Sequence, residues 1–260
     1  MATNPPPMPA AGDAFESRRS PGCWLLRGAA APLVAFTTRL GGVSEGPYAS
    51  LNLGLSTADD PGRVAVNRAR LAGHLGLDEI ATVRQVHGAG LHVVRAGGPA
   101  GAGDVLATTR PDLALAVATA DCLGVAVWDA ERTALAVAHA GWRGVLAGAL
   151  EAALGWLARE RPGRPLRAAI GPALRVCCFE VGPEVAERFP SLHLRPGARR
   201  PHLDLAGAAR GRLRAAGVAD EAIAEAGACT CCTPELFYSH RRDGGVTGRH
   251  WTVARLRPAP

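Results

Sequence analysis

The segment ALAVAHAGWRGVLAGALEAALGWLARE, residues 134–160, joins a short apolar run to a longer helical pattern. Residues 134–138 are typical of a buried strand, and the residues from Val145 onward predict a helix. His139 therefore falls at the carboxyl end of the strand, in a turn whose glycines let the backbone approach a ligand closely. The N–H groups that open the helix attract anions. The segment predicts either a ligand site or a tight turn with a surface histidine and arginine.

Strand-like and helix-like stretches alternate irregularly around this segment, which predicts an α/β fold with mixed sheets. Strands are expected at residues 82–86, 91–94, 104–109, 113–118, 123–129, 167–170 and 250–256. Helices are expected at residues 61–76, from 145, from near Pro183 and after an Asp cap at Asp204. In the helix at 61–76, the positions Val64, Asn67, Leu71 and Leu75 are spaced to share one face.

The chain of 260 residues is long enough to bury a large core in one domain. Residues 1–20 are proline-rich and are expected to form a disordered tail, with 21–260 as a single domain. The tail lacks the apolar core of a secretory signal, and no apolar stretch could span a bilayer. We therefore expect a cytoplasmic protein that makes no contact with membranes.

The net charge of +6 does not indicate a nucleic-acid partner. Every one of the 29 basic residues is an arginine, no basic run exceeds two residues, and no basic patch is interleaved with aromatic residues. A small anionic substrate explains the arginines at least as well.

Two histidines and a cysteine stand at predicted strand ends: His87 in RQVHG, Cys122 in TADC and His139 in HAGWRG. They can converge only through the fold, and convergence of strand ends is how α/β proteins assemble sites. Two imidazoles and a thiolate with an open fourth position would form a catalytic zinc site. Spacing alone is weak support, because no short metal-binding motif links the three residues.

Six motifs occur in one order: TTRLGGVSEGPYASLNLG (37–54), QVHG (85–88), TADC (119–122), HAGWRG (139–144), IGP (170–172) and SHRRDGGVTGRH (239–250). Together they resemble the YfiH family, also called the laccase-domain or multicopper polyphenol oxidase family, whose members are regarded as purine nucleoside phosphorylases. The resemblance covers roughly residues 34–256. One departure is Leu123, where many members have proline.

The resemblance implies a layered α/β sandwich with mixed sheets and a zinc ion bound by His87, Cys122 and His139. It also implies phosphorolysis of purine nucleosides, deamination of adenosine and cleavage of methylthioadenosine. The alternative activity is that of an amidase editing a nucleotide-linked peptidoglycan precursor of the UDP-MurNAc-L-Ser type. A zinc-stabilised binding protein without activity is a further alternative. The sequence does not indicate an oligomeric state.

The older oxidase name does not fit the residues. A multicopper oxidase needs many histidines in H-x-H pairs, whereas this chain has eight histidines and no such pair. A blue-copper centre usually takes a weak axial methionine, and both methionines, Met1 and Met8, lie in the predicted tail. Laccase chemistry is therefore not expected, although Cu²⁺ could occupy a zinc site in vitro.

Two further residues are predicted to act with Cys122 in catalysis. Asp121 could move a proton or orient a ligand, with capping of a turn as the alternative. Arg143 is the cation expected on the substrate phosphate, because a guanidinium can grip a phosphate with two hydrogen bonds. The alternative for Arg143 is a surface position at the helix start.

Substrate-binding roles are predicted for residues of two loops: Arg39, Ser44, Asn52, Arg242 and Arg249. Arg39 could instead form a salt bridge within its loop. Ser44 and Asn52 could merely satisfy the backbone of a loop rich in glycine and serine. The arginines of the terminal loop, which also include Arg241, are expected to divide between the site and acidic partners.

Seven cysteines, an odd number, argue against a disulfide framework. Five of them, Cys177, Cys178, Cys229, Cys231 and Cys232, raise the possibility of a second metal site. Only Cys229 and Cys232 have C-x-x-C spacing, and adjacent cysteines are not expected to point inward together. We therefore interpret the five as small buried or loop residues.

Overall fold

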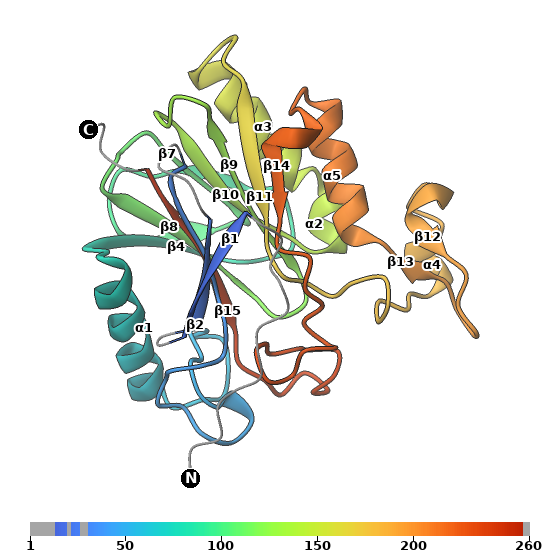
Figure 1. Cartoon of the computed structure of the whole chain (residues 1–260), viewed down its shortest axis with the longest axis horizontal. Coiled ribbons are helices and arrows are strands. Elements are labelled where there is room, and N and C mark those ends of the chain that lie inside the picture. Colours follow the sequence, from blue (N-terminus) through green and yellow to red (C-terminus); the bar gives the residue numbers. More distant parts are fainter. Residues whose placement is uncertain (1–13, 20–21, 27–30, 257–260) are drawn as a thin grey trace.

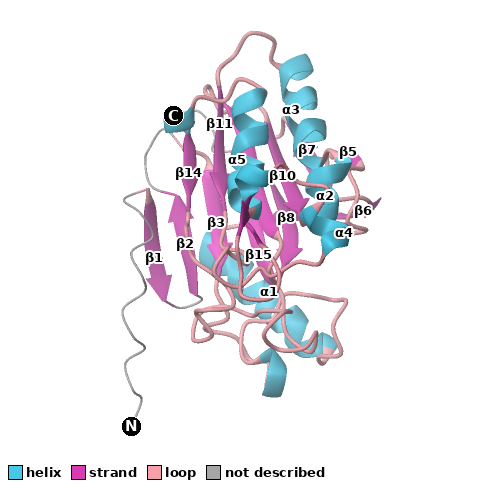
Figure 2. Ribbon diagram, turned by 90° about the vertical axis from the view of Figure 1, so that its right-hand side faces the viewer, coloured by secondary structure: helices cyan, strands magenta, loops and turns pink. Residues whose placement is uncertain are grey.

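The computed structural model describes residues 14–19, 22–26 and 31–256, and these form four layers. A seven-stranded sheet has the order β1-β2-β3-β15-β8-β4-β6, and a six-stranded sheet has the order β14-β11-β9-β10-β7-β5. Helix α1 covers the outer face of the first sheet, while α2, α3 and α5 lie over the second (Figures 1 and 2). Parallel and antiparallel pairs occur in both sheets, which confirms the predicted α/β fold with mixed sheets.

The seven-stranded sheet comprises β1 (Phe15–Arg19), β2 (Gly22–Leu26), β3 (Leu33–Thr37), β4 (Glu79–Arg84), β6 (Gly98–Ala102), β8 (Leu113–Thr119) and β15 (His250–Arg255). The six-stranded sheet comprises β5 (Leu91–Val93), β7 (Val105–Thr108), β9 (Leu123–Asp129), β10 (Leu135–Ala140), β11 (Leu166–Ile170) and β14 (Ile223–Glu225). A separate pair is β12 (Leu194–Arg195) with β13 (His202–Leu203). The α-helices are α1 (Pro61–Leu75), α2 (Trp142–Ala147), α3 (Ala149–Glu160), α4 (Pro183–Ala186) and α5 (Leu205–Ala215).

The alternation of side chains along β10 explains why its residues are almost all apolar. Ala136 and Ala138 pack in the cluster that includes the helices, whereas Leu135 and Val137 pack in the cluster between the two sheets. A strand covered on both faces needs apolar residues at every position rather than at every second one. The apolar run at residues 134–138 therefore indicates a strand in the middle of a layered fold.

The helix predicted from Val145 differs in the structure. α2 already begins at Trp142 and ends at Ala147, Gly148 follows it with φ 92° in the left-handed region, and α3 begins directly afterwards at Ala149. The N–H of Gly148 bonds to the carbonyls of Gly144 and Val145, which is the way glycine commonly ends a helix. His139 consequently lies one residue inside the end of β10, and only Ala140 and Gly141 separate it from α2.

Helix α1 confirms the helix predicted at residues 61–76. All four predicted face positions are buried, and Asp60 caps the helix by accepting hydrogen bonds from the N–H groups of Gly62 and Arg63. The buried amide of Asn67 donates to Ser44 Oγ and to two backbone carbonyls, so this polar position on the core face is satisfied.

The two strands expected around residues 87–90 belong to different sheets. β4 lies in the seven-stranded sheet and β5 in the six-stranded sheet, so the segment between them crosses from one layer to the other instead of forming a hairpin turn. His87 lies on this crossing segment.

The predicted disordered tail of residues 1–20 overlaps a strand. β1 pairs antiparallel with β2, and Phe15 is buried with its ring centroid 5.6 Å from that of Phe36. Burial of this one aromatic side chain stabilises a segment whose composition resembles a tail. Residues 1–13 lie outside the described part of the chain. Across the described ranges, the structure contains no helix with the length and apolar character needed to cross a membrane.

Candidate functional site

The structure brings His87, Cys122 and His139 together. Each offers one ligand atom, and these three atoms lie within 4.8 Å of one another. The rings of His87 and His139 are 4.9 Å apart and nearly perpendicular. Cys122 directly precedes β9, which pairs antiparallel with β10, so strand register alone places it beside the end of the strand that carries His139.

A buried carboxylate that the sequence analysis missed, Asp104, organises this cluster. Asp104 is fully buried, and its Oδ1 lies 2.8 Å from Nδ1 of His139. The same carboxylate accepts hydrogen bonds from the N–H groups of Val86, His87 and Gly88. It therefore orients one imidazole directly and fixes the turn that presents the other. The only sequence signal was a lone aspartate immediately before the apolar run of β7.

Two non-glycine residues of the site have backbones in the left-handed region. His87 has φ 59° and Asp121 has φ 95°, and such conformations are strained and cluster at functional sites. Asp104 holds the first of these turns. Thr230 Oγ1 and the N–H of Arg241 both donate to the carboxylate of Asp121 and hold the second.

The thiolate form of Cys122 and the protonated form of His139 stabilise each other. Burial disfavours ionisation of Cys122, but His139 and His87 outweigh that effect and lower the pKa of the thiol to about 6. Burial likewise disfavours protonation of His139, but Cys122 and Asp104 raise its pKa to about 9. The site thus favours the thiolate, which is the form of cysteine that binds metals.

Gly141, which lies between β10 and α2 in HAGWRG, leaves no room for a side chain because Cys122 and His87 are so close to it. A Cβ on Gly141 would lie 2.7 Å from Cys122 Sγ and 3.7 Å from the His87 ring. Any side chain at this position would therefore push into the ligand cluster.

A cavity of about 670 Å³ opens beside the cluster of His87, Cys122 and His139. Four arginines line it, namely Arg68, Arg84, Arg241 and Arg249, together with His240. Aromatic side chains that line it are Trp142, Phe179 and Trp251. The cavity therefore combines cationic and flat apolar surfaces next to the cluster. Sequence reasoning missed Arg68, whose guanidinium lies over the ring of Trp251 and whose burial lowers its pKa to about 10.

Of the other predicted site residues, Asp121 and Arg249 line the cavity. Burial lowers the pKa of Arg249, while the charges of Cys122 and Asp121 act in the opposite direction, so its guanidinium lies within electrostatic reach of both. Arg143 is exposed and is absent from the cavity lining; its guanidinium lies over Trp142, 4.3 Å from the ring centroid.

Ser44 and Asn52 are buried in a network within their own loop and do not line the cavity. Ser44 Oγ donates to Asp59, and the Asn52 amide donates to Asp59 and Thr57. The side-chain oxygen of Asn52 accepts from the backbone N–H of Arg249. Their contacts thus shape the loop and hold the backbone of Arg249 in place.

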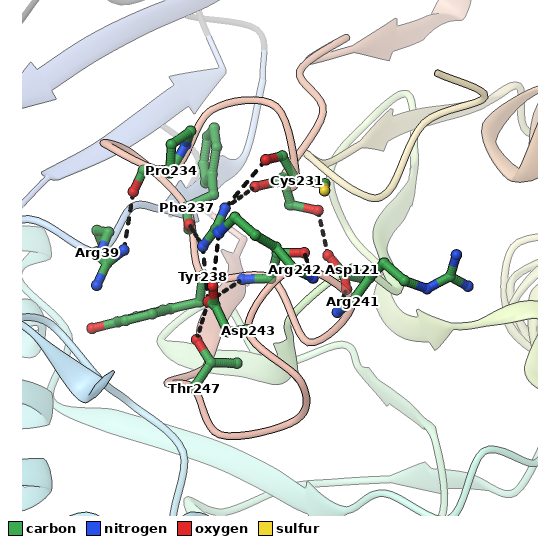
Figure 3. A network of polar contacts seen from close by, with 12 residues as sticks. Arg39, Asp121, Cys231, Pro234, Phe237, Tyr238, Arg241, Arg242, Asp243 and Thr247 are labelled. Carbon is green, nitrogen blue, oxygen red and sulfur yellow. Dashed lines mark hydrogen bonds and ion pairs between the residues drawn. The ribbon is translucent and has the colours of Figure 1, made fainter. Parts of the chain in front are cut away.

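Arg39 and Arg242 also hold loops together rather than facing the cavity (Figure 3). Arg39 donates to the carbonyls of Ala49 and Pro234. The guanidinium of Arg242 donates to the carboxylate of Asp243 and to three backbone carbonyls, those of Thr230, Cys231 and Phe237. These contacts occupy the guanidinium of Arg242, so this residue stabilises the terminal loop.

Comparison with known proteins agrees with this architecture. Residues 33–257 match the family model described as multi-copper polyphenol oxidoreductase laccase. A protein of Deinococcus radiodurans named purine nucleoside phosphorylase is 44% identical over 252 residues, covering 91% of this chain and 94% of the relative. Purine nucleoside phosphorylase YlmD of Geobacillus stearothermophilus is 36% identical, covering 87% and 92%.

Solved structures show the same fold. The crystal structure of Bacillus licheniformis YfiH superimposes with a TM-score of 0.88 at 32% identity, covering 95% of this chain and all of that one. The crystal structure of YlmD from Geobacillus stearothermophilus gives a TM-score of 0.86 at the same identity and coverage. The chain therefore belongs to the family of laccase-like, multi-copper polyphenol oxidoreductase proteins that includes YfiH and YlmD.

Proposed function

We propose that this chain is a zinc-dependent purine nucleoside phosphorylase whose metal is held by His87, Cys122 and His139. The observation that carries the proposal is the position of this three-donor cluster on a cavity lined by both arginines and aromatic rings. Relatives that match most of the chain bear the name purine nucleoside phosphorylase, which supports the same activity here.

The residues present fit zinc. Imidazole nitrogen and thiolate sulfur are the donors that zinc prefers, and three protein ligands leave the fourth position for water or substrate. The contact from Asp104 to Nδ1 of His139 leaves Nε2 for the metal, an arrangement common around zinc-bound histidines. When bound, zinc would supply a Lewis acid and lower the pKa of a bound water.

The arginines of the cavity would hold phosphate. Arg249 is the best placed, because it lies within reach of the cluster and its backbone is fixed by Asn52. Arg241 reaches the cavity from the same loop, and its backbone N–H is tied to Asp121. Guanidinium groups held in this way bind phosphate oxygens with charge-assisted hydrogen bonds.

The aromatic rings would position the base. Trp142 and Phe179 give flat apolar surfaces on which a purine can stack. In phosphorolysis a phosphate oxygen bonds to C1′ of the sugar while the bond from C1′ to the purine nitrogen breaks, and the base leaves with a proton. The protein contributes by holding the two reactants in line and by stabilising charge that develops in the transition state.

The same cavity would also cleave methylthioadenosine with phosphate and deaminate adenosine. Deamination consumes water in place of phosphate and releases ammonia, so it needs no phosphate. Asp121 would act as a positioning residue, since both of its oxygens already accept hydrogen bonds from Thr230 and Arg241.

The test is a mass-spectrometric assay of purified protein with adenosine, inosine or methylthioadenosine, each with and without phosphate. Adenosine with phosphate should yield adenine and ribose 1-phosphate, and inosine should form with or without phosphate. A Cys122→Ala variant purified in the same way should lose both products, because both depend on one cluster.

Two outcomes would contradict the proposal. Retention of both products by Cys122→Ala would assign them to a contaminating enzyme. Absence of base release from zinc-replete protein, with release of an amino acid from a muramyl-linked precursor, would favour an amidase instead.

A further inference from the structure

A second cluster of potential metal ligands lies outside the cavity. Cys177, Cys178, Cys229 and Cys232 each offer a sulfur, and all four sulfurs lie within 4.8 Å of one another. Cys232 Sγ is 3.5 Å from that of Cys177 and 3.2 Å from that of Cys178. Among residues whose contacts are described, this cluster and the His87, Cys122, His139 cluster are the groups of three or more that could hold a metal ion.

These separations match a tetrahedral thiolate site. With metal–sulfur bonds of about 2.3 Å, the sulfurs of a tetrahedral ZnS₄ centre are about 3.8 Å apart. A set of four sulfurs within 4.8 Å needs only small side-chain movements to reach that geometry. Cysteines that merely fill a loop have no reason to converge in this way from segments 51 residues apart in sequence, Cys178 to Cys229.

Adjacent cysteines are not expected to point inward together, and Cys177 is exposed; its sulfur and that of Cys178 nevertheless belong to one cluster. The carbonyl of Arg175 accepts hydrogen bonds from the N–H groups of Cys178 and Phe179, so the backbone here is a helical turn. Successive side chains on a helical turn diverge by about 100°, rather than pointing to opposite sides as in a strand. Two neighbouring sulfurs can therefore reach one point.

The second pair has the geometry of a metal-binding turn. Cys229 and Cys232 have C-x-x-C spacing, which is common in structural zinc sites. Residues 230–232 form a turn between the two cysteines, and Thr233 Oγ1 donates a hydrogen bond to the carbonyl of Cys229. The two sulfurs of this pair therefore come from one turn.

We propose that Cys177, Cys178, Cys229 and Cys232 bind a structural zinc ion with four thiolates. The ion would fasten the turn after β11 to the start of the terminal loop. The residue after Cys229 is Thr230, whose hydroxyl donates to Asp121, and the carbonyl of Cys231 accepts from Arg242 (Figure 3). The zinc ion would therefore stabilise the position of the loop that carries Arg241 beside the cavity.

The test is metal analysis of protein purified anaerobically under reducing conditions. Wild type should contain about two zinc ions per chain, and Cys122→Ala about one. The double variant Cys177→Ser/Cys232→Ser, in which both positions are exposed, should lose one ion while keeping the one at Cys122. Cys231→Ser is the matched control: Cys231 lies between two of the ligands in sequence but is outside the set of four, and this variant should keep both ions.

Cobalt(II) exchange gives a readout that does not depend on activity. The remaining site of Cys122→Ala should show intense thiolate-to-cobalt charge transfer, and Cys177→Ser/Cys122→Ala should show it weakened or lost. If the Cys122→Ala variant contains no zinc and has a disulfide between Cys178 and Cys232, the proposal is overturned. Iron in place of zinc at this site would also overturn it. Loss of the second ion in Cys231→Ser, with retention in the double variant, would overturn the ligand assignment.

Discussion

The two ligand clusters differ in the number of protein donors and in what surrounds them. His87, Cys122 and His139 supply three donors at a cavity, with His139 only 3% exposed. The cysteine cluster supplies four donors away from that cavity; Cys177 and Cys232 are exposed, Cys178 is half-buried and Cys229 is buried. Three donors leave a position for chemistry and four close the site. The difference in donor number predicts catalysis at one cluster and support of a loop at the other.

The clusters also differ in how their donors are held. The first depends on a buried carboxylate, Asp104, and on residues with strained backbones. The second depends on two short turns, one at residues 175–179 and one at residues 230–232. Strain accompanies the cluster that faces the cavity, in keeping with the tendency of strained residues to occur at functional sites.

Removal of a donor from the first cluster should have the largest effect. His87→Ala should lower nucleoside turnover by about a thousandfold, since the metal contributes several kcal/mol to the transition state. His92 is half-buried, and the hydrogen bond described for its ring is to the carbonyl of Ala102, so His92→Ala is the matched control and should retain turnover. Steady-state kinetics checks both. Equal losses in the two variants would show that the first cluster is not the centre of the reaction.

Removal of the carboxylate behind the first cluster should have the next largest effect. Asp104→Asn should weaken zinc binding about 10–100-fold, because it disturbs the orientation of His139 and the turn at His87. Asp129 is equally buried and accepts hydrogen bonds from Thr133 and Ala134 away from the site, so Asp129→Asn controls for stability. Competition with a chromophoric chelator measures the affinity. Unchanged affinity in Asp104→Asn would remove this carboxylate from the metal site.

Removal of a cavity arginine should have a smaller effect. Arg249→Met keeps the aliphatic stem and should raise the KM for phosphate roughly tenfold, since a charge-assisted contact contributes about 1.5 kcal/mol. Arg143→Met should change it less, because Arg143 lies over Trp142 outside the cavity lining. Kinetics at varied phosphate checks both, with zinc content as the control. A larger effect at Arg143 would restore that residue as the phosphate ligand.

The last prediction concerns the pH dependence of stability, to which the buried His250 contributes. Burial and the charges of Arg39 and Arg249 lower its pKa to about 3, opposite to the raised pKa of His139. Below about pH 6.5 the unfolded chain takes up a proton that the folded chain resists, so stability should fall with pH down to about 3, by at most about 1.4 kcal/mol per pH unit. His250→Gln should flatten this part of the profile in urea unfolding experiments. Identical profiles would show that His250 does not contribute.

The sequence predicted the parts of the molecule that have a period or a motif. Helix α1 was predictable because its four buried positions repeat at helical spacing. His87, Cys122 and His139 were recognisable as a candidate cluster because each lies in a motif, and the structure brings them together. Asp104 was not predictable, since a single carboxylate before a strand has no pattern, and its role appears only when β7 and β10 are neighbours. The convergence of four cysteines was not predictable, because the helical turn at Arg175 could not be read from adjacent cysteines.

The contacts of Asp104 determine when the first cluster can form as the chain folds. This one side chain holds both the 86–88 turn and the ring of His139, and β7, which begins at the next residue, pairs with β10. The three side chains are therefore placed by strand pairing and a buried hydrogen bond, neither of which involves a metal ion. The folded chain has them already in position, so a metal ion could bind late in folding, leave and be replaced without unfolding the chain.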